Sequence, residues 1–207
     1  MAKIKYFLQQ SWLLIVASFC FGLLIAVTSA GLSPRIRQNE INKRNRLVSA
    51  LLPEARDFIP LDEKIEFQPP RGKPENIEIY KAVSKTGECV GWSFEAIGSG
   101  FQDKIKLVIA VDKDFEKIAG FDVLSSNETP GFGDQIKNDY YRNQFKGAPA
   151  GELKLVTVGE PKKIDSEIVA ISGATISSEA VVDIVSNYIT QVKEQMQKKG
   201  IIGNGKQ

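Results

Sequence analysis

Residues 172–178 read Ser-Gly-Ala-Thr-Ile-Ser-Ser and join a short apolar run to the best amphipathic pattern that follows the N-terminal segment. Small residues let a ligand approach the backbone closely. We expect a helix to begin at about Ser177, so that its free N–H groups and the positive end of its dipole favour an anion here. Thr175 places a hydroxyl at the same point. The pattern also fits a plain tight turn with a serine cap, or a nucleophilic Ser172 or Thr175 with a lysine base.

A second loop, residues 127–133, reads Asn-Glu-Thr-Pro-Gly-Phe-Gly. Its Pro-Gly pair predicts a type II turn in which Gly131 takes a positive φ. Glu128 and Thr129 bring hydrogen-bonding groups that suit the polar edge of a planar ring, and the glycines at 131 and 133 give such a ring room. By itself, the stretch is typical of an ordinary surface loop.

The segments around these loops predict an α+β domain. Residues 179–198 repeat apolar side chains every three to four positions, which predicts an amphipathic helix. Alternating and apolar runs predict strands, with a hairpin turn at Thr86-Gly87. The expected strands are residues 77–83, 89–97, 105–111, 117–124 and 153–158, and residues 134–145 are expected to form a short helix. Antiparallel hairpins with helices between and after them define the α+β class.

The N-terminal segment is expected to be a membrane anchor. No charged residue occurs between Tyr6 and Pro34, and residues 12–30 are almost wholly apolar. About 20 such residues span a bilayer as a helix. A cleaved signal peptide is the alternative, although its apolar region is usually shorter, ~7–15 residues. Basic residues flank the span on both sides, so charge alone leaves its orientation open.

A juxtamembrane helix and a linker are expected over residues 32–76. Ser33-Pro34 is typical of a helix start, and the same stretch also fits a continuation of the anchor helix. The helical pattern stops at Pro53, and residues 53–76 hold five of the nine prolines, which favours a connecting loop. The expected organisation is an anchor at 1–31, the helix and linker at 32–76, a folded domain at 77–199 and a flexible tail at 200–207.

Composition excludes several kinds of chemistry. The 207-residue chain has no histidine, which rules out Ser-His and Cys-His catalysis and histidine metal sites. Its two cysteines, Cys20 and Cys89, are too few for an iron–sulfur cluster, which takes about four thiolates. Any redox chemistry must therefore come from an organic cofactor. The net charge of +2 argues against nucleic acid as the main partner.

Residues 172–178 resemble the flavinylation motif of FMN-binding domains, in which the threonine of Ser-Gly-Ala-Thr carries FMN through a phosphoester bond. Residues 128–133 resemble the Glu-Thr-Pro-Gly-Leu-Gly signature of the same domains, with Phe132 in place of leucine. Residues 45–53, after the anchor, resemble the juxtamembrane segment of two related proteins. These are the G subunit of the Rnf ion-translocating electron-transport complex and the C subunit of the sodium-translocating NADH:quinone oxidoreductase. One position departs from the pattern, because such domains often carry an aspartate where Val169 stands.

The resemblance implies an α+β FMN-binding domain behind a single transmembrane helix, with FMN attached covalently at Thr175 by a flavin transferase. It further implies that Glu128 and Thr129 bond the ring or ribityl chain, and that N–H groups near Ser177 and Ser178 meet the phosphate. Trp92 is an aromatic candidate for the ring's neighbourhood, with core packing as its alternative. The implied cofactor-binding residues are Thr175, Ser172, Gly173, Ala174, Ser177, Ser178, Glu128, Thr129, Gly131 and Gly133.

The function that the resemblance implies is that of a redox subunit in a membrane complex of the Rnf type, rather than that of a stand-alone enzyme. The implied partners are the other subunits of the complex, the transferase, and the bilayer through residues 12–30. The protein would be a single-pass protein of the inner or plasma membrane with its soluble domain outside the cytoplasm. The C subunit of the sodium-translocating oxidoreductase and a cofactor-free, membrane-anchored scaffold module are the alternatives.

Overall fold

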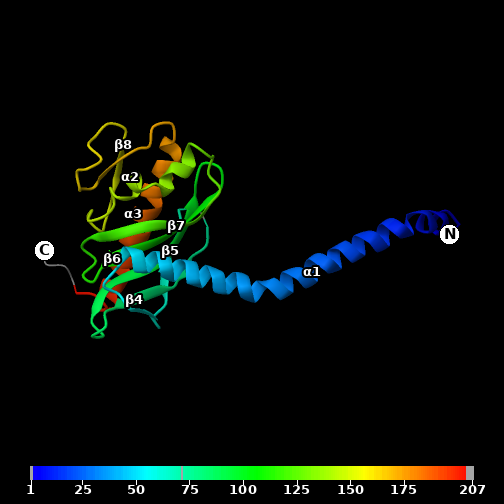
Figure 1. The fold of residues 1–207 in the computed structure, drawn as a ribbon, viewed down its shortest axis with the longest axis horizontal. Helices are drawn as coiled ribbons and strands as arrows, with labels where there is room; N and C mark the ends of the chain where they lie inside the picture. Colours follow the sequence, from blue (N-terminus) through cyan, green and yellow to red (C-terminus); the bar gives the residue numbers. More distant parts are fainter. Residues whose placement is uncertain (1, 71, 204–207) are drawn as a thin grey trace. The chain divides into compact units, whose positions relative to one another are not determined.

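The computed structural model describes residues 2–70 and 72–203, with side chains from residue 11 onward. The chain divides into two compact units, Met1–Lys43 and Arg44–Gln207, each of which is described by itself. A single helix, α1 (Ala2–Leu51), runs through the first unit and contributes its last residues to the second. Figure 1 shows α1 in blue to cyan, followed by the strands and helices of the second unit.

Within the described residues, α1 is the one helix that is long and apolar enough to cross a membrane. Its large apolar side chains between Trp12 and Val27 are exposed, as lipid-facing side chains would be. The helix continues through Pro34, so the predicted start at Ser33 is wrong and the alternative, a continuation of the anchor helix, is confirmed. The Ser33 hydroxyl donates to the Ser29 carbonyl oxygen at 2.6 Å.

An antiparallel sheet of five strands, in the order β1-β4-β5-β6-β7, is the framework of the second unit. Hairpins connect β4 through β7 in sequence, and the predicted turn at Thr86-Gly87 is confirmed by a positive φ of 82° at Gly87. The sheet strands are β1 (Asp57–Pro60), β4 (Ile79–Val83), β5 (Cys89–Ser99), β6 (Lys104–Asp112) and β7 (Ile118–Ser126). The four strands predicted between residues 77 and 124 are thereby confirmed as β4 to β7.

The prediction of a connecting loop over residues 53–76 is wrong, because three short strands lie there. Strand β1 pairs with β4 at the edge of the sheet. Strands β2 (Ile65–Phe67) and β3 (Glu75–Ile77) form a separate antiparallel pair. The prolines do not prevent this, since Pro60 is the last residue of an edge strand, a position where proline is tolerated. Much of the predicted linker therefore belongs to the folded unit.

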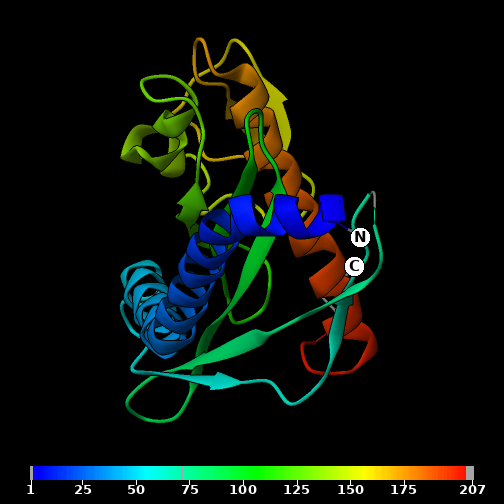
Figure 2. The same cartoon turned by 90° about the vertical axis from the view of Figure 1, so that its right-hand side faces the viewer.

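Two hydrophobic layers cover the two faces of the sheet. The predicted C-terminal helix is confirmed as α3 (Thr175–Lys198), and Figures 1 and 2 show it crossing one face. Alternation along β6 sends Leu107 and Ile109 into the cluster that contains α3, and Val108 and Ala110 into the opposite cluster. That second cluster includes Val48 and Leu52, from the last turn of α1 and the residue after it.

The predicted helix at residues 134–145 is split in two. Its first part is a 3₁₀ helix, η1 (Gly133–Lys137), and its second is α2 (Asp139–Arg142). Asn138 separates them, because its backbone is extended, with φ −77° and ψ 144°. The predicted strand at 153–158 is confirmed in shorter form as β8 (Lys154–Val156), which pairs in parallel with β9 (Glu167–Val169).

The chain does not fray directly after α3, so the prediction of a flexible tail from residue 200 is wrong for residues 200–203. Gly200 takes a positive φ of 69°, and the Ile201 N–H donates to the Met196 carbonyl oxygen at 2.9 Å. This is the arrangement of a Schellman C-cap. Ile202 is then buried in the main core. Residues 204–207 lie outside the described residues.

Candidate functional site

The two loops singled out in the sequence meet at one end of the second unit. The loop after β7 contains Glu128, and the loop after β9 leads into α3. Ser177 Oγ donates a hydrogen bond to Glu128 Oε2 at 2.5 Å, which joins segments 49 residues apart in the sequence. Both side chains are buried, so the bond is shielded from water. A buried, charge-assisted hydrogen bond of this kind is among the stronger ones in proteins.

A third segment, the turn between β5 and β6, completes this junction, and sequence reasoning missed it. The Gln102 N–H donates to Glu128 Oε1 at 3.1 Å, and Thr129 Oγ1 donates to Gln102 Oε1 at 3.2 Å. A Cβ at Gly100 would lie 2.3 Å from Glu128 Oε1, so only glycine fits there. The signal that could have found the turn is the glycine pair at positions 98 and 100, directly before the residues that contact Glu128.

Gly133 lies at the contact between the two loops. The sequence suggested that it gives room to a planar ring. In the structure, a Cβ at Gly133 would lie 2.6 Å from Ser177 Oγ and 2.8 Å from Glu128 Oε2. The glycine therefore leaves space for the Glu128–Ser177 hydrogen bond.

Gly131 and Gly173 shape the two loops through their backbone conformations. The Phe132 N–H donates to the Thr129 carbonyl oxygen at 3.2 Å, and Gly131 has a φ of 77°, so the predicted type II turn is confirmed. Gly173 also has a positive φ, 79°, and a Cβ there would lie 3.4 Å from Phe132 Cδ1. Phe132 thus lies beside the loop that holds Thr175.

Thr175 is exposed and is the first residue of α3. The helix begins two residues earlier than predicted, with Ala174 as an N-cap whose side chain makes no capping hydrogen bond. The Ser178 N–H donates to the Ala174 carbonyl oxygen at 3.0 Å and is thus not available to a ligand, contrary to the prediction. Among the described parts of the chain, the N–H groups of residues 175–177 have no hydrogen-bond acceptor, as expected for the first turn of a helix.

These features fit a phosphate ester at Thr175. An exposed hydroxyl stands next to three unpaired N–H groups at the positive end of a 24-residue helix. Ser172 and Gly173 are exposed, whereas Ala174, Ser177 and Ser178 are buried and pack the loop against the interior of the unit. Apolar side chains flank the hydroxyl: Phe132 is 57% exposed and Ile176 is 55% exposed. Exposed apolar groups of this size next to exposed polar groups are typical of a surface that a ligand or partner covers.

Trp92 lies away from this end of the sheet. It pairs with Val111, whereas the site lies at the other end of the same hairpin, at the Ser99–Lys104 pair. Seven residues separate Trp92 from Ser99, which is roughly 23 Å of extended strand. The indole is buried in the core, and its N–H donates to the Lys113 carbonyl oxygen at 3.1 Å. The core-packing alternative for Trp92 is therefore confirmed, and its indole lies at the opposite end of the strand from the two loops.

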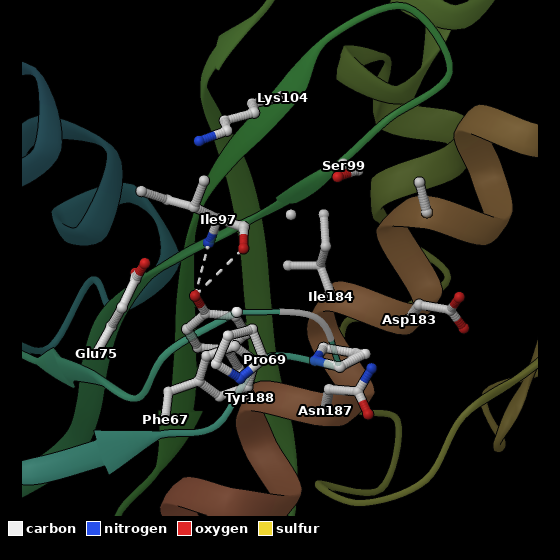
Figure 3. Close-up of a pocket in the computed structure, with 14 residues that line it drawn as sticks. Phe67, Pro69, Glu75, Ile97, Ser99, Lys104, Asp183, Ile184, Asn187 and Tyr188 are labelled. Carbon is white, nitrogen blue, oxygen red and sulfur yellow. Dashed lines mark hydrogen bonds between the residues drawn. The ribbon is translucent and has the colours of Figure 1, made fainter.

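A separate cavity of about 510 Å³ lies further along α3. Figure 3 shows Tyr188 and Ile184 of α3 facing Ile97 of β5, with Pro69 below. The Tyr188 hydroxyl hydrogen-bonds both the N–H and the carbonyl oxygen of Ile97, each at 3.2 Å. None of the residues that line this cavity comes from the two loops that meet at Glu128.

Comparison with known proteins places the chain in a family. A model of the FMN-binding domain matches residues 100–190. The chain is 31% identical to the G subunit of the ion-translocating oxidoreductase complex of Methanosarcina acetivorans, over 88% of this chain and 92% of that protein. It is also 31% identical to the G subunit of the Na(+)-translocating ferredoxin:NAD(+) oxidoreductase complex of Acetobacterium woodii, over 94% of this chain and 95% of that protein.

A solved structure shows the same fold. It is the crystal structure of the C subunit of the Na(+)-translocating NADH-quinone reductase from Parabacteroides distasonis, which matches with a TM-score of 0.57 and 20% identity. The match covers 78% of this chain and 94% of that one. This chain therefore belongs to the G-subunit family of Rnf-type ion-translocating oxidoreductase complexes, and its second unit contains an FMN-binding domain.

Proposed function

We propose that this chain carries FMN through a phosphoester to Thr175 and serves as an electron-transfer subunit of a membrane ion-translocating complex of the Rnf type. The observation that carries the proposal is the position of Thr175. Its exposed hydroxyl is on the first residue of α3, beside unpaired N–H groups, in a loop held by the Glu128–Ser177 hydrogen bond. The family to which the chain belongs supports the same role.

The residues of this site would hold the phosphate by its charge. When Thr175 Oγ displaces AMP from FAD, a P–O bond forms to the threonine, the pyrophosphate bond breaks and the hydroxyl loses its proton. The resulting diester carries one negative charge. The N–H groups of residues 175–177 and the helix dipole stabilise that charge without an arginine. A separate flavin transferase would carry out this step.

The ring would lie against the exposed apolar surface beside Thr175. Phe132 and Ile176 offer that surface, and Thr129 offers a half-buried hydroxyl for a polar edge. Both oxygens of Glu128 already accept hydrogen bonds from the protein, so its main contribution is to hold the three segments together. FMN, when bound, supplies one- and two-electron redox chemistry, and the covalent link keeps it from diffusing away.

The membrane helix would serve as an anchor. No charged residue lies between positions 6 and 34, so α1 offers no path for an ion, and ion movement would belong to the other subunits. Residues 12–30 would contact the lipid of the inner or plasma membrane. By the family resemblance, the soluble domain would lie outside the cytoplasm and face the neighbouring electron carriers.

The alternatives have less support. The solved C-subunit structure matches at 20% identity, which supports a shared fold alone, whereas the two G-subunit relatives match at 31% over most of the chain. A serine hydrolase would need a base for Ser172, and no hydrogen bond joins the Ser172 hydroxyl to another side chain in the part of the chain that the structure describes. A cofactor-free scaffold module does not account for the match to the FMN-binding domain over residues 100–190.

The proposal is tested by the flavin fluorescence of the protein band after denaturing gel electrophoresis. Full-length protein from its native membrane should fluoresce, and Thr175→Ala should abolish the signal. Thr157→Ala, which replaces an exposed threonine after β8, is the matched control and should leave the signal intact. A dark wild-type band, or a fluorescent Thr175→Ala band, would contradict the attachment.

A further inference from the structure

The loop that carries Thr175 is held at both ends by two buried side chains from one short segment. Tyr141 belongs to α2, and Gln144 follows it by three residues. Tyr141 is fully buried and Gln144 is 4% exposed. Neither residue belongs to the two motifs that identified the site, yet each makes its hydrogen bonds to the backbone that flanks Thr175.

Gln144 holds the entry to the loop. The Val169 N–H donates to Gln144 Oε1 at 2.8 Å, and Gln144 Nε2 donates to the Val169 carbonyl oxygen at 3.1 Å. Strand β9 pairs with β8 on its other edge, where the Ala170 N–H donates to the Val156 carbonyl oxygen at 2.8 Å. The carboxamide thus takes the place of an antiparallel neighbour on the free edge of β9, which ends three residues before Ser172.

Tyr141 holds the exit from the loop. Its hydroxyl donates to the Ser178 carbonyl oxygen at 2.9 Å. Ser178 Oγ in turn accepts from the Ile171 N–H at 3.0 Å and donates to the Ala174 carbonyl oxygen at 2.9 Å, which closes the loop on itself. Burial raises the pKa of the Tyr141 hydroxyl, so it keeps its proton and remains a donor.

The segment that carries both side chains is itself anchored to the sheet. The rings of Tyr141 and Phe145 lie edge-on to Phe121 of β7, with centroids 6.5 and 4.7 Å away. Arg142 forms ion pairs with Asp122 of β7 and with Asp139, the latter at 2.5 Å. These contacts to β7 and within α2 hold the segment without involving the loop that it supports.

We propose that Tyr141 and Gln144 are positioning residues for flavin attachment: their hydrogen bonds to Ser178 and Val169 hold Thr175 and the N–H groups beside it in the geometry that accepts and keeps FMN. This inference rests on the proposed function for its effect on flavin. It also explains how Val169 is accommodated, since the support acts on the backbone of residue 169 and does not need an acidic side chain there.

The chain offers matched controls, because similar hydrogen bonds from a glutamine and a tyrosine to the backbone occur away from the loop. Gln195 of α3 hydrogen-bonds both the N–H and the carbonyl oxygen of Glu66 in β2, as Gln144 does for Val169. The Tyr188 hydroxyl donates to the Ile97 carbonyl oxygen, as the Tyr141 hydroxyl does to that of Ser178, and it also accepts from the Ile97 N–H. The test therefore compares Gln144→Leu with Gln195→Leu, and Tyr141→Phe with Tyr188→Phe.

Each full-length variant would be produced in membranes together with the flavin transferase. Two quantities would be measured: the initial rate of covalent flavin attachment per amount of protein, and amide hydrogen exchange in residues 169–178. The exchange rate reports how often the hydrogen bonds of residues 169–178 open, and its measurement does not require flavin. Thermal unfolding of each variant shows whether it is folded at the temperature used.

Gln144→Leu and Tyr141→Phe are each expected to slow attachment about tenfold, which corresponds to ~1.4 kcal/mol, and to speed exchange in residues 169–178. The two controls should leave both quantities within about twofold of the wild type at a similar loss of stability. Wild-type attachment and wild-type exchange in the loop variants would overturn the proposal, as would equal losses in all four. If the wild type itself takes no flavin, the proposed function fails, and unchanged exchange in the loop variants would then overturn the positioning role as well.

Discussion

Replacing Gly133 with alanine is expected to destabilise the second unit, because the new methyl group enters the contact between Glu128 and Ser177. An ideal Cβ at this position lies 2.6 Å from Ser177 Oγ and 2.8 Å from Glu128 Oε2. Both distances are shorter than real Cβ contacts. Either the hydrogen bond between these two side chains opens, or the backbone of the loop moves.

The size of the effect follows from these two responses. Overpacking of a tight site costs ~1–3 kcal/mol, and a hydrogen bond to a charged group contributes ~1.5–3 kcal/mol. Because one response partly relieves the other, the expected loss in the free energy of unfolding is about 2–4 kcal/mol. For a unit of roughly 160 residues, ~1 kcal/mol moves the Tm by ~2–4 °C, so the Tm should fall by about 4–16 °C.

Thermal unfolding of the full-length protein in detergent, followed by tryptophan emission, measures this loss. Gly151→Ala is the control, since nothing lies within 4 Å of its Cβ, and it should stay within about 0.5 kcal/mol of the wild type. Gly131→Ala also points into open space but has a φ of 77°, so it should cost only the backbone strain of ~1–2 kcal/mol. If Gly133→Ala has the same Tm as Gly151→Ala, the contact between Glu128, Ser177 and Gly133 is not as tight as described.

Three further variants probe other parts of the second unit. Burial raises the pKa of the Asp183 carboxyl, so the folded state binds the proton more tightly than the unfolded state does. The charged carboxylate therefore lowers the free energy of unfolding at neutral pH, and this loss disappears below the ordinary pKa of the group. Asp183→Asn should therefore raise the Tm at about pH 7 and lose that advantage near pH 3, and a constant gain across this range would contradict the reasoning. Deleting residues 200–207 removes the buried Ile202 and should cost ~2 kcal/mol in unfolding experiments, and an unchanged Tm would show that this residue does not stabilise the core. Trp92→Phe should lower the Tm but leave the flavin absorption spectrum unchanged, and a spectral shift would show that Trp92 lies close to the flavin.

Local patterns predicted the parts of the fold that depend on neighbouring residues. The strands from β4 to β7 follow from alternation and from turn residues such as Gly87, and α3 follows from apolar spacing. Strands β1 to β3 were missed because they are short, lie among prolines and are held by distant residues. The Gln195 side chain that bonds the Glu66 backbone comes from 129 residues further along the chain, and no local pattern reports such a contact.

The site was predictable in its motifs but not in its construction. Both loops were recognised from their residues, and the structure brings them together through Glu128 and Ser177. The contribution of Gln102 was missed, because it depends on which hairpin turn lies beside the loop in three dimensions. The roles of Tyr141 and Gln144 were missed for the same reason, since a buried tyrosine or glutamine has the same local sequence whether it supports a loop or fills the core.

Peptide mass mapping of the protein purified from its native membrane tests the central claim most directly. The peptide that contains residues 172–178 should carry the mass of FMN less one water, and fragmentation should place that mass on Thr175. An unmodified peptide, or the flavin located on another residue, would contradict the account.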